Sequence, residues 1–591
     1  MKCISHPFRY FFILLMTISG YAVSSAEIIP PERRIDWNPG ITAEEPERNV
    51  IEDVMSFGAF GDGITDDSQA FWDAINALTE QGGMLYIPRG TYLIKKKLSI
   101  DKGILIKGAG SDKTKLIFDL NKRKENCIEF VKYDRGDYID VLEGAKKGSE
   151  MLIIENASGF KANDFIELRQ DNDPDVMYTR SDWNQSWAQQ AVGQLFRIKA
   201  VNNDTLFLEK SVYLDYQQEL NPVVRKLGMV MFPGVEDLSL ERLDAGDGHT
   251  IQMRYVAYGR VQRIESSMTY RTHVYLSDAI GCEVVQNYLH HSHDYGGGGH
   301  GYGVDVIGRS TDNLVMNNVF EYLRHSMMTH VGACGNVFAY NYSHSRHRLR
   351  LCDISIHGHY PYLNLFESNK IHEIDIADYW GPAGPGNTFL RNTIMTEGID
   401  VMDESHHQNV VGNVLEKNNV SVNNHVNGTL THGNVIGDMT RWDPNIDDHN
   451  IPVSLFLTEK PDFWGDQPWP IYGPDVDEQA QLPAEQRFYS GEPVTGVKQQ
   501  SVTLPHTFRL AVYPNPFNPS STVSFQLERQ TEIEIRVYDI NGRIVEKLLD
   551  SKLAAGHHSV RFTPKNISTG VYLIHIQGDD FSEMRKVSFI R

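Results

Sequence analysis

Short segments that alternate hydrophobic and polar residues recur through the middle of the chain. Five of them are long enough for a β-strand and too short for a helix: NLVMNNVF, GNVFAYNY, YLNLFESN, NTFLRNTI and NVVGNVLE. Four pairs of asparagines, each five residues apart, accompany these segments: Asn313 and Asn318, Asn336 and Asn341, Asn364 and Asn369, Asn387 and Asn392. A strand-forming unit repeated with one internal spacing predicts a solenoid.

The repeat length supports this prediction. Asparagines at positions 287, 318, 341, 369, 392, 413 and 434 are separated by 31, 23, 28, 23, 21 and 21 residues, a period near 22. One coil of a β-helix has this length, and its parallel strands stack about 4.8 Å apart. Stacked asparagines at the bends should form ladders of side-chain amides that satisfy the backbone groups of the turns. The alternative, that asparagine only marks ordinary turns, leaves the constant internal spacing unexplained.

Two of these coils are longer than the others. Their additional residues include DYGGGGHGYG (294–303) and CDISIHGHYPY (352–362). Extended loops on a rigid scaffold are where binding and catalysis concentrate, so we expect the functional site near these two loops.

The segments before the repeat predict a cap and an insertion. Thr65 or Asp66 is expected to begin an amphipathic helix, and short β-segments follow over 84–120. Two β-rich arms around a loop predict an inserted β-subdomain over 145–215. The loop carries Tyr178, Trp183 and Trp187, which either stack on sugar rings or pack the insert onto the solenoid; packing is favoured, since aromatic residues bury large areas wherever they lie.

The two ends of the chain have other patterns. Residues 1–26 combine a basic start, an apolar run and the sequence Ser24-Ser25-Ala26, which predict a secretory signal peptide. Residues 27–50 and 476–504 are expected to be linkers, and 505–591 alternates strands and turns as a small β-sandwich would. No other stretch of 18 or more residues is apolar, so no membrane span is predicted.

Charge and cysteine content narrow the function classes. The net charge of -21 does not suit a nucleic-acid partner. The cysteines beyond the signal peptide form no CxxC pair, so we expect buried thiols rather than zinc ligands or a disulfide framework. They are Cys127, Cys282, Cys334 and Cys352.

Two groups of motifs resemble known families. FGAFGDGITDDSQAFWDAI followed by GGMLYIPRGTYLI resembles the opening of the pectate-lyase and polygalacturonase-like superfamily. This resemblance implies an all-β fold, a right-handed parallel β-helix over 51–475 with an N-terminal capping helix, but no particular reaction, because lyases, hydrolases, epimerases and phage tailspikes share it. YPNPFNPSST, VYDINGRIV and GVYLIHI resemble the C-terminal sorting domain read by the type IX secretion machinery, with an Ig-like β-sandwich fold. They imply a secreted or cell-surface protein, and leave open whether the domain is cleaved or retained as an anchor.

The candidate catalytic and binding residues occupy equivalent positions in successive coils. Counted from the index asparagines, equivalent positions of successive coils should stack on one face. The sixth and seventh positions hold His293, Arg324, His347, Asp375, Asp294, His325 and Arg348, and a second column holds His290, Glu321, His344, His372 and Glu416. Residues 321–360 contain four arginines, six histidines and two acids, a basic band in an acidic protein. Either acids of neighbouring coils pair with these arginines, or the band lines a groove for an anionic polysaccharide.

The second interpretation predicts a reaction. Cleavage of a polyuronate by β-elimination needs a donor set for the carboxylate, a base for the α-proton and an acid for the leaving oxygen. Arginine suits the first role and histidine the second. The predicted catalytic residues are Arg324, His325, Arg346 and His347, and the predicted substrate-binding residues are His293, Arg348, His357, His359, Asp378, Tyr379 and Trp380.

The sequence lacks motifs of two enzymes of this superfamily, so other activities stay open. We find neither the paired aspartates with a downstream RxK of polygalacturonases nor a clear carboxylate cluster for the calcium site of pectate lyases. No metal ligands or cofactor are therefore assigned, and Ca²⁺ stays open. The first hypothesis is an exported lyase of an acidic polysaccharide. The alternatives are a glycoside hydrolase of the same fold, a non-catalytic polysaccharide-binding surface protein, and a purely structural solenoid whose arginines are paired with acids.

Overall fold

The structure, a computed structural model, describes residues 28–78, 82–347, 352–377, 379–490, 510–527, 529–565, 567–578 and 581–591. The expected signal peptide lies outside the described residues, as do Arg348 and Asp378.

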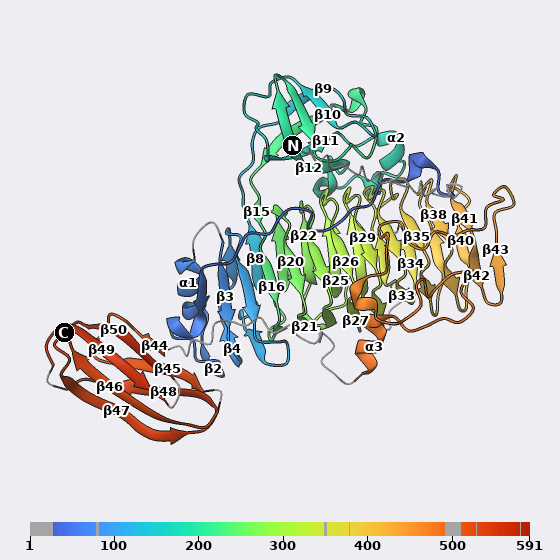
Figure 1. Ribbon diagram of the computed structural model, residues 1–591. Coiled ribbons are helices and arrows are strands. Elements are labelled where there is room, and N and C mark those ends of the chain that lie inside the picture. Colours follow the sequence, from blue (N-terminus) through green and yellow to red (C-terminus); the bar gives the residue numbers. More distant parts are fainter. Residues whose placement is uncertain are drawn as a thin grey trace, which may run out of the picture.

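Three long sheets, which we name A, B and C, wind around one hydrophobic core and confirm the predicted parallel β-helix (Figure 1). Sheet A contains β1 (Ile51–Asp53), β3 (Met84–Ile87), β6 (Leu105–Gly108), β16 (Gly234–Glu236), β20 (Arg260–Gln262), β23 (Glu283–Val285), β26 (Leu314–Met316), β29 (Val337–Ala339), β32 (Leu365–Glu367), β35 (Thr388–Leu390), β38 (Asn409–Val411) and β41 (Leu430–His432).

Sheet B is parallel except for its last strand, which turns back on its neighbour. It contains β2 (Asp62–Asp66), β4 (Gly90–Ile94), β7 (Thr114–Phe118), β17 (Ser239–Arg242), β21 (Glu265–Thr269), β24 (Tyr288–Ser292), β27 (Val319–Glu321), β30 (Tyr342–Ser343), β33 (Lys370–Ile371), β36 (Thr393–Ile394), β39 (Val414–Leu415), β42 (Asn434–Ile436) and β43 (Met439–Arg441).

Sheet C carries the candidate site. It contains β5 (Leu98–Ile100), β8 (Ile128–Val131), β18 (Ile251–Arg254), β22 (Thr272–Ser277), β25 (Tyr302–Ile307), β28 (His325–His330), β31 (Ile354–Ile356), β34 (Ile374–Ile376), β37 (Ile399–Val401) and β40 (Val420–Val422). Within a coil the chain passes from A to B to C, so each strand of sheet C has one end at the B–C turn and the other at the C–A turn.

Two ladders of buried amides run along the solenoid, as the asparagine spacing predicts. In the first, each Nδ2 donates to Oδ1 of the next member over 2.9–3.0 Å. Its members are Asn287, Asn318, Asn341, Asn369, Asn392, Asn413 and Asn434. The second ladder links Asn313, Asn336, Asn364 and Asn387 over 2.8–3.0 Å. The five-residue spacing therefore places one asparagine directly before a sheet A strand and the other directly before the following sheet B strand in four successive coils.

The first coils are capped by helix α1 (Ser68–Ala77), which buries Phe71 and Ile75 against the core. Its N-cap is Asp67, so the expected caps, Thr65 and Asp66, were misplaced by one or two residues. Asp67 instead accepts hydrogen bonds from the backbone of the preceding turn, and burial raises its pKa to about 6.

The segment expected to be an N-terminal linker lies along the solenoid (Figure 1). Trp37 Nε1 donates to the carbonyl of Leu363 over 2.8 Å, and Gly40 N donates to that of Asp312 over 2.8 Å. Arg48 donates to the carbonyls of Gly103 and Phe232. Backbone contacts to coils far apart in sequence fix this segment in place.

The insertion after β8 is a closed antiparallel barrel. Its strands are β9 (Ile139–Glu143), β10 (Met151–Ile154), β11 (Phe165–Arg169), β12 (Gly193–Asn202), β13 (Thr205–Leu208) and β14 (Val223–Leu227), so it extends beyond the expected 145–215. The short helix α2 (Pro174–Met177) lies in its long loop. Buried Glu167 of the barrel pairs with Arg225 and with Arg309 of the solenoid. Nη2 of Arg309 also lies 2.7 Å from Oδ1 of Asp278. This ion network joins the barrel to the coils.

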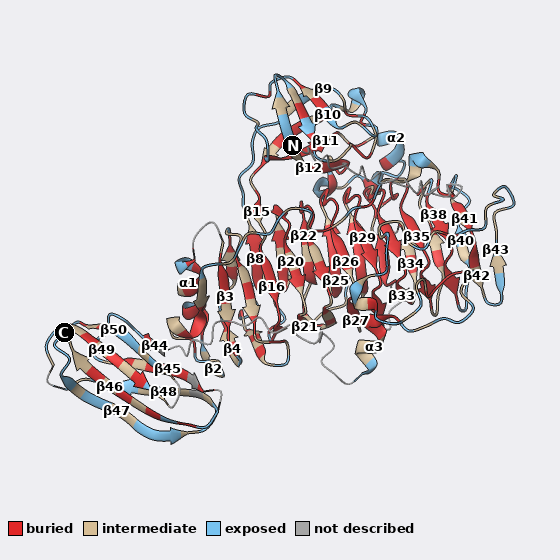
Figure 2. Ribbon diagram, viewed as in Figure 1, coloured by how far each residue is buried: buried red, intermediate tan, exposed pale blue. Residues whose placement is uncertain are grey.

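The C-terminal region forms two antiparallel sheets around a separate core. One contains β44 (Leu510–Tyr513), β45 (Ser521–Leu527) and β48 (Gly556–Phe562); the other contains β46 (Thr531–Asp539), β47 (Ile544–Leu553), β49 (Gly570–Gln577) and β50 (Ser582–Phe589). Figure 2 shows a largely buried solenoid interior and an exposed β47. A third helix, α3 (Pro483–Tyr489), packs near β27. Across the described ranges no helix has the length and apolar character needed to cross a membrane.

Candidate functional site

The outward face of sheet C is built by strand alternation. Residues such as Val304, Met327 and Ile354 point into the core, so their neighbours point outward. Strand register stacks one outward column from Gln252 through Tyr275, Asp305, Met328, Ser355 and Asp375 to Asp400. A second column, at the C–A edge beside the barrel, contains Arg254, Ser277, Ile307 and His330.

Exposure divides the face into two parts. Met328 and Ser355 in the middle of the first column are fully buried, whereas Asp375 and Asp400 beyond them are partly exposed. In the edge column, Arg254 and His330 are partly exposed. A long ligand that follows the C–A edge would therefore pass the buried middle of the first column and reach this column again at Asp375 and Asp400.

Asp305 and His330 form a pair at this edge. Nε2 of His330 lies 3.1 Å from Oδ1 of Asp305, and both side chains are largely buried. No described residue accepts or donates a hydrogen bond of good geometry at either imidazole nitrogen. The neighbouring Tyr275 has its pKa raised by burial and by the negative charge of Asp305, and its ring stacks on His249 at 4.1 Å. A carboxylate-oriented imidazole is a candidate general base, and the phenol of Tyr275 lies on the other side of Asp305, two coils from His330.

An aromatic wall stands next to this pair. Trp187, in the short helix η4 (Ser186–Ala188) of the insertion, lies 4.5 Å from the ring of His359 and 5.7 Å from that of Trp380. Trp187 is 48% exposed and Tyr379, which packs on Trp380, is 61% exposed. Indole faces open to solvent beside polar rings suit stacking on sugars.

The insertion is anchored where it contributes to the wall. Trp183 is buried, and its Nε1 donates to the carbonyl of Tyr379 over 3.1 Å. Trp183 thus packs the insertion onto the solenoid, as the favoured prediction stated. Trp187 differs, because about half of its surface stays exposed. The ring of His357 lies 5.6 Å from that of His330, so His357 lies near His359, Tyr379 and Trp380. That these four residues bind substrate stays a prediction, and Asp378 lies outside the described residues.

A cationic patch lies at the other end of the edge column. Arg135 and Arg254 stand 5.6 and 5.4 Å from the ring centre of Tyr255, and Arg254 also faces Tyr133. No described carboxylate lies within ion-pair distance of either arginine. The nearby Asp278 is held by Arg309. This patch, which we define as Arg135, Arg254, Tyr133 and Tyr255, keeps its positive charge available for a ligand.

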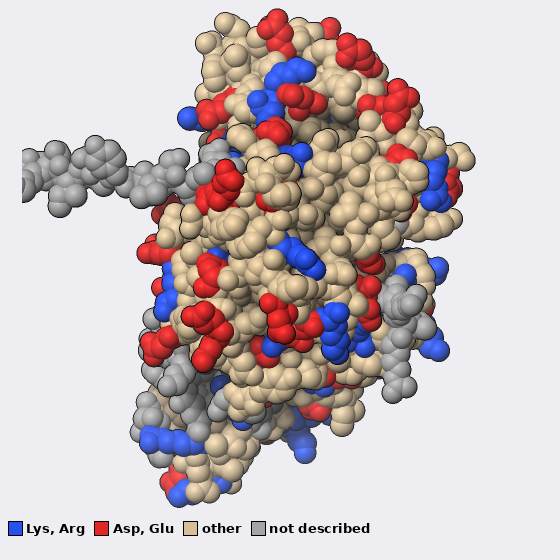
Figure 3. All heavy atoms as spheres, turned by 90° about the vertical axis from the view of Figure 1, so that its right-hand side faces the viewer, with Lys and Arg blue, Asp and Glu red and all other residues tan. Residues whose placement is uncertain are grey.

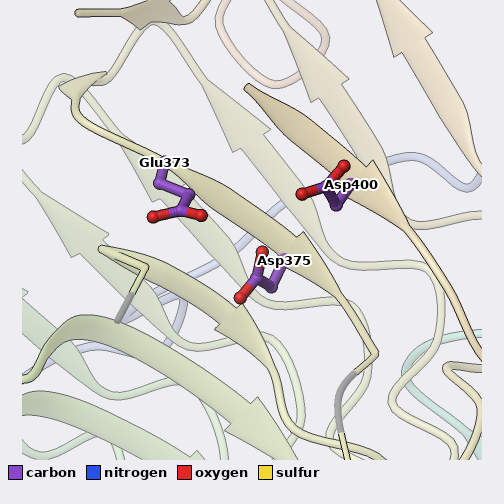
Figure 4. A group of neighbouring side chains, drawn as sticks. All are labelled: Glu373, Asp375 and Asp400. Carbon is purple, nitrogen blue, oxygen red and sulfur yellow. The ribbon is translucent and has the colours of Figure 1, made fainter. Parts of the chain in front are cut away.

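Three carboxylates converge on the later coils of the same face. Glu373, Asp375 and Asp400 place one oxygen each within 4.8 Å of the others, and Figure 4 shows them turned toward a common centre. Arg346 pairs with Glu373 and, over 3.1 Å, with Glu397. Burial and the negative charges of neighbouring carboxylates nevertheless raise the pKa of Glu373. Carboxylate oxygens suit a hard cation such as Ca²⁺, although the guanidinium of Arg346 already occupies one of the three.

The predicted catalytic residues lie at the opposite, B–C edge of sheet C. Arg324 donates to the carbonyl of Gly296, and Nδ1 of His325 lies 2.8 Å from the carbonyl oxygen of Cys352. His347 stacks on Tyr295 at 4.1 Å. Nε2 of His293 lies 2.9 Å from the carbonyl oxygen of Arg242, and Arg348 lies outside the described residues. His325 and His330 are five positions apart along β28, about 16 Å. The two predicted groups therefore do not form one site.

Sequence reasoning missed the centre of the face. Asp305, His330, Asp400 and the cationic patch were not singled out, and Asp375 was placed in a column without its acidic neighbours. Arg346 pairs with acids of adjacent coils. For this arginine, the structure agrees with the alternative interpretation, in which acids of neighbouring coils neutralise the basic band.

A cavity of about 400 Å³ lies away from sheet C, between the N-terminal segment and the insertion. Lys147 and Lys210 line it, but both ammonium groups already bond to backbone carbonyls of residues 32–38. These lysines fasten the segment to the barrel.

Comparisons with known proteins place this geometry in a class. Residues 51–166 match the family model described as rhamnogalacturonase A/epimerase, pectate lyase-like, and residues 511–589 match the secretion system C-terminal sorting domain. The fold and these matches define a pectate-lyase-like parallel β-helix protein. Its sorting domain directs it by type IX secretion to the cell surface or the extracellular space.

Individual relatives match only in part. The iota-carrageenase of Zobellia galactanivorans is 29% identical over 140 residues, 22% of this chain and 28% of that protein. The plasmin and fibronectin-binding protein A of Streptococcus pneumoniae is 53% identical over 45 residues, 7% of this chain and 6% of that protein. The solved tailspike gp49 of Pseudomonas phage LKA1 is 11% identical with a TM-score of 0.47, covering 91% of this chain and 98% of the other.

Proposed function

We propose that the protein is an extracellular glycoside hydrolase that cleaves an acidic polysaccharide on sheet C. The observation that carries the proposal is the convergence of Glu373, Asp375 and Asp400, in the same coils as Trp380. Glycosidic hydrolysis needs two carboxyl groups and a platform that positions the sugar, and the face supplies both.

The roles follow from the surroundings of each carboxyl group. Glu373, whose pKa is raised by burial, donates its proton to the leaving glycosidic oxygen. Asp400 attacks the anomeric carbon as the C–O bond breaks, since Asp375 is already engaged by the thiol of Cys352. Water, deprotonated by Glu373, then releases the sugar from Asp400. Oxygens within 4.8 Å are close to the about 5 Å carboxyl spacing of retaining enzymes, so we expect retention of anomeric configuration.

β-Elimination is the second candidate, favoured by Asp305 and His330. His330 would remove the α-proton, but Tyr275, the nearby phenol, lies two coils away, about 10 Å, from this base. The reaction also needs a cation at the substrate carboxylate. Arg254 stands three coils from His330, about 14 Å away, and so would hold a neighbouring sugar instead. This distance ranks hydrolysis above elimination.

One assay separates the candidates. The purified protein is incubated with pectate, alginate and a glycosaminoglycan, and reducing ends and the ultraviolet absorbance of unsaturated ends are both followed. Hydrolysis gives reducing ends without absorbance; elimination gives both. Absence of both signals with all three polymers would leave only the non-catalytic alternatives.

Single substitutions test which side chains are catalytic. Asp400→Asn should lower kcat at least about 100-fold, as expected for loss of a reacting carboxyl group. The exposed Asp447 lies outside the face, and Asp447→Asn serves as the matched control with unchanged kcat. If His330→Gln abolishes turnover while Asp400→Asn does not, elimination replaces hydrolysis.

A further inference from the structure

The sorting domain contacts the N-terminal end of the solenoid. Its strand β44 lies against the short helix η2 (Val54–Phe57), and Figure 1 shows the domain beside β2 and α1. At this contact the ring of Tyr513 lies on Gly58, the residue that ends η2. Tyr513 also opens the motif YPNPFNPSST, so a residue of the domain's own sequence signature meets the solenoid.

Gly58 provides the space for this ring. A Cβ at position 58 would lie 2.5 Å from Cδ1 and 2.9 Å from Cγ of Tyr513, well inside the about 3.5–4.0 Å at which carbon atoms pack. Gly58 also has a φ of +92°, in the left-handed region that glycine adopts without strain. Position 58 therefore suits glycine both for its backbone and for the ring that packs on it.

The surface around Gly58 is uncharged. We name residues 54–61 the cap turn; its sequence, VMSFGAFG, contains no acidic or basic residue, and Phe60 is 41% exposed. The end of the last coils differs: Figure 3 shows acidic side chains in several clusters there, with basic side chains between them. Covering charged groups with an aromatic ring costs free energy unless they are paired, so the tyrosine fits the cap turn and not the last coils.

The contact is too small to hold two separate molecules together. It joins a strand of four residues to a helix of four residues, and Tyr513 keeps 40% of its surface exposed. Stable interfaces between separate proteins bury about 1,200–2,000 Å². Within one chain the covalent link acts instead, because it raises the effective concentration of the domain at the cap turn to about a millimolar.

We infer that the cap turn is a docking site for this chain's own sorting domain, occupied through Tyr513 only while the domain is covalently attached. A cut between residues 490 and 510 then releases the domain and leaves the cap turn open. The inference does not depend on the proposed hydrolysis, because the contact lies at the end of the solenoid, between β1 and β2, and not on sheet C.

Hydrogen exchange tests the docked state in the full chain. In the Tyr513→Ser variant, the amides of the cap turn should exchange at least about threefold faster than in the wild type, because the ring no longer covers them. Tyr538, which is partly exposed on β46, gives the matched control Tyr538→Ser with unchanged exchange at the cap turn. Exchange in β49 shows whether each variant keeps the sorting domain folded. Equal exchange of the cap turn in wild type and Tyr513→Ser overturns the inference.

A cross-link gives a second readout of docking. Cγ of Tyr513 lies close enough to position 58 for the pair Gly58→Cys and Tyr513→Cys to meet the Cβ separation of about 3.5–4.5 Å that a disulfide requires. The native cysteines among the described residues are all buried, so they do not compete. Glu546 is exposed on β47, and Gly58→Cys with Glu546→Cys is the control pair. The first pair should form at least about tenfold more disulfide, and equal yields mean that the domain does not dock.

A protease site placed between residues 490 and 510 tests the dependence on the covalent link. After cleavage, the two parts should separate on size exclusion at micromolar concentration, and the cap turn should exchange as fast as in Tyr513→Ser. The uncut protein with the same site is the control and should exchange like the wild type. A domain that stays bound after the cut refutes the requirement for covalent attachment.

Discussion

Replacing one rung of the asparagine ladder should destabilise several coils. Asn341 is fully buried, and its Nδ2 donates to the carbonyl of Val315 and to Oδ1 of Asn369, each over 2.9 Å. Its Oδ1 accepts from the backbone N and from Nδ2 of Asn318 over 3.0 and 2.9 Å. Asn341→Ala removes all four bonds, including those to two backbone groups. At about 1–3 kcal/mol for each buried group left unpaired, the expected loss is about 4 kcal/mol.

Guanidinium unfolding and hydrogen exchange measure this loss. Because a solenoid couples each coil mainly to its neighbours, exchange should accelerate most in β26, β29 and β32. Asn418 is exposed, and Asn418→Ala is the matched control, with a change within about 0.5 kcal/mol. If the two variants unfold at the same denaturant concentration, the ladder does not stabilise the solenoid as argued.

Three further predictions concern buried charge and the location of catalysis. Burial raises the pKa of Glu367 to about 7, above the unfolded value of about 4.3, so this group's stabilisation is present at low pH and is lost as pH rises toward 7. The Glu367→Gln variant should not show that loss. In urea titrations, its free energy of unfolding relative to that of the wild type should therefore rise by about 3 kcal/mol between pH 4 and pH 8. If the two proteins show parallel changes of stability with pH, the assignment is wrong. Arg309→Met should cost about 3–5 kcal/mol and loosen the barrel, seen as faster exchange in β11, because Glu167 and Asp278 lose a buried partner; unchanged exchange would refute the anchoring role. His325→Ala should keep the kcat that Asp400→Asn loses, and the opposite result would assign catalysis to His325 instead of Asp400.

The sequence predicts the ladders well because they depend on local spacing. Two asparagines five residues apart flank one short strand of sheet A, so the interval is independent of the loops elsewhere in the coil. The carboxylates depend on those loops. Asp375 lies six residues after Asn369, and Asp400 lies eight residues after Asn392, yet register makes them neighbours. A fixed offset from the index asparagine therefore cannot align them.

The histidines show the same limit. His325 and His330 belong to one strand, and sequence counting selected the first because it falls at a constant offset. Its Nδ1 faces the carbonyl of Cys352, whereas His330 faces a carboxylate and the aromatic wall. Which end of a strand faces the aromatic wall is decided by what packs over the turn, here an insertion more than 100 residues earlier in the chain.

The insertion thus links stability to recognition. The solenoid fixes the spacing of its outward columns at about 4.8 Å, and its buried ladders leave no freedom to move one column relative to another. Trp187 is different, since it reaches the face from a barrel that is held by Glu167, Arg309 and Trp183. A change in that attachment would move the stacking surface without altering any carboxylate. Affinity for a stacked sugar and the proposed acid–base chemistry should therefore vary independently among variants of this chain.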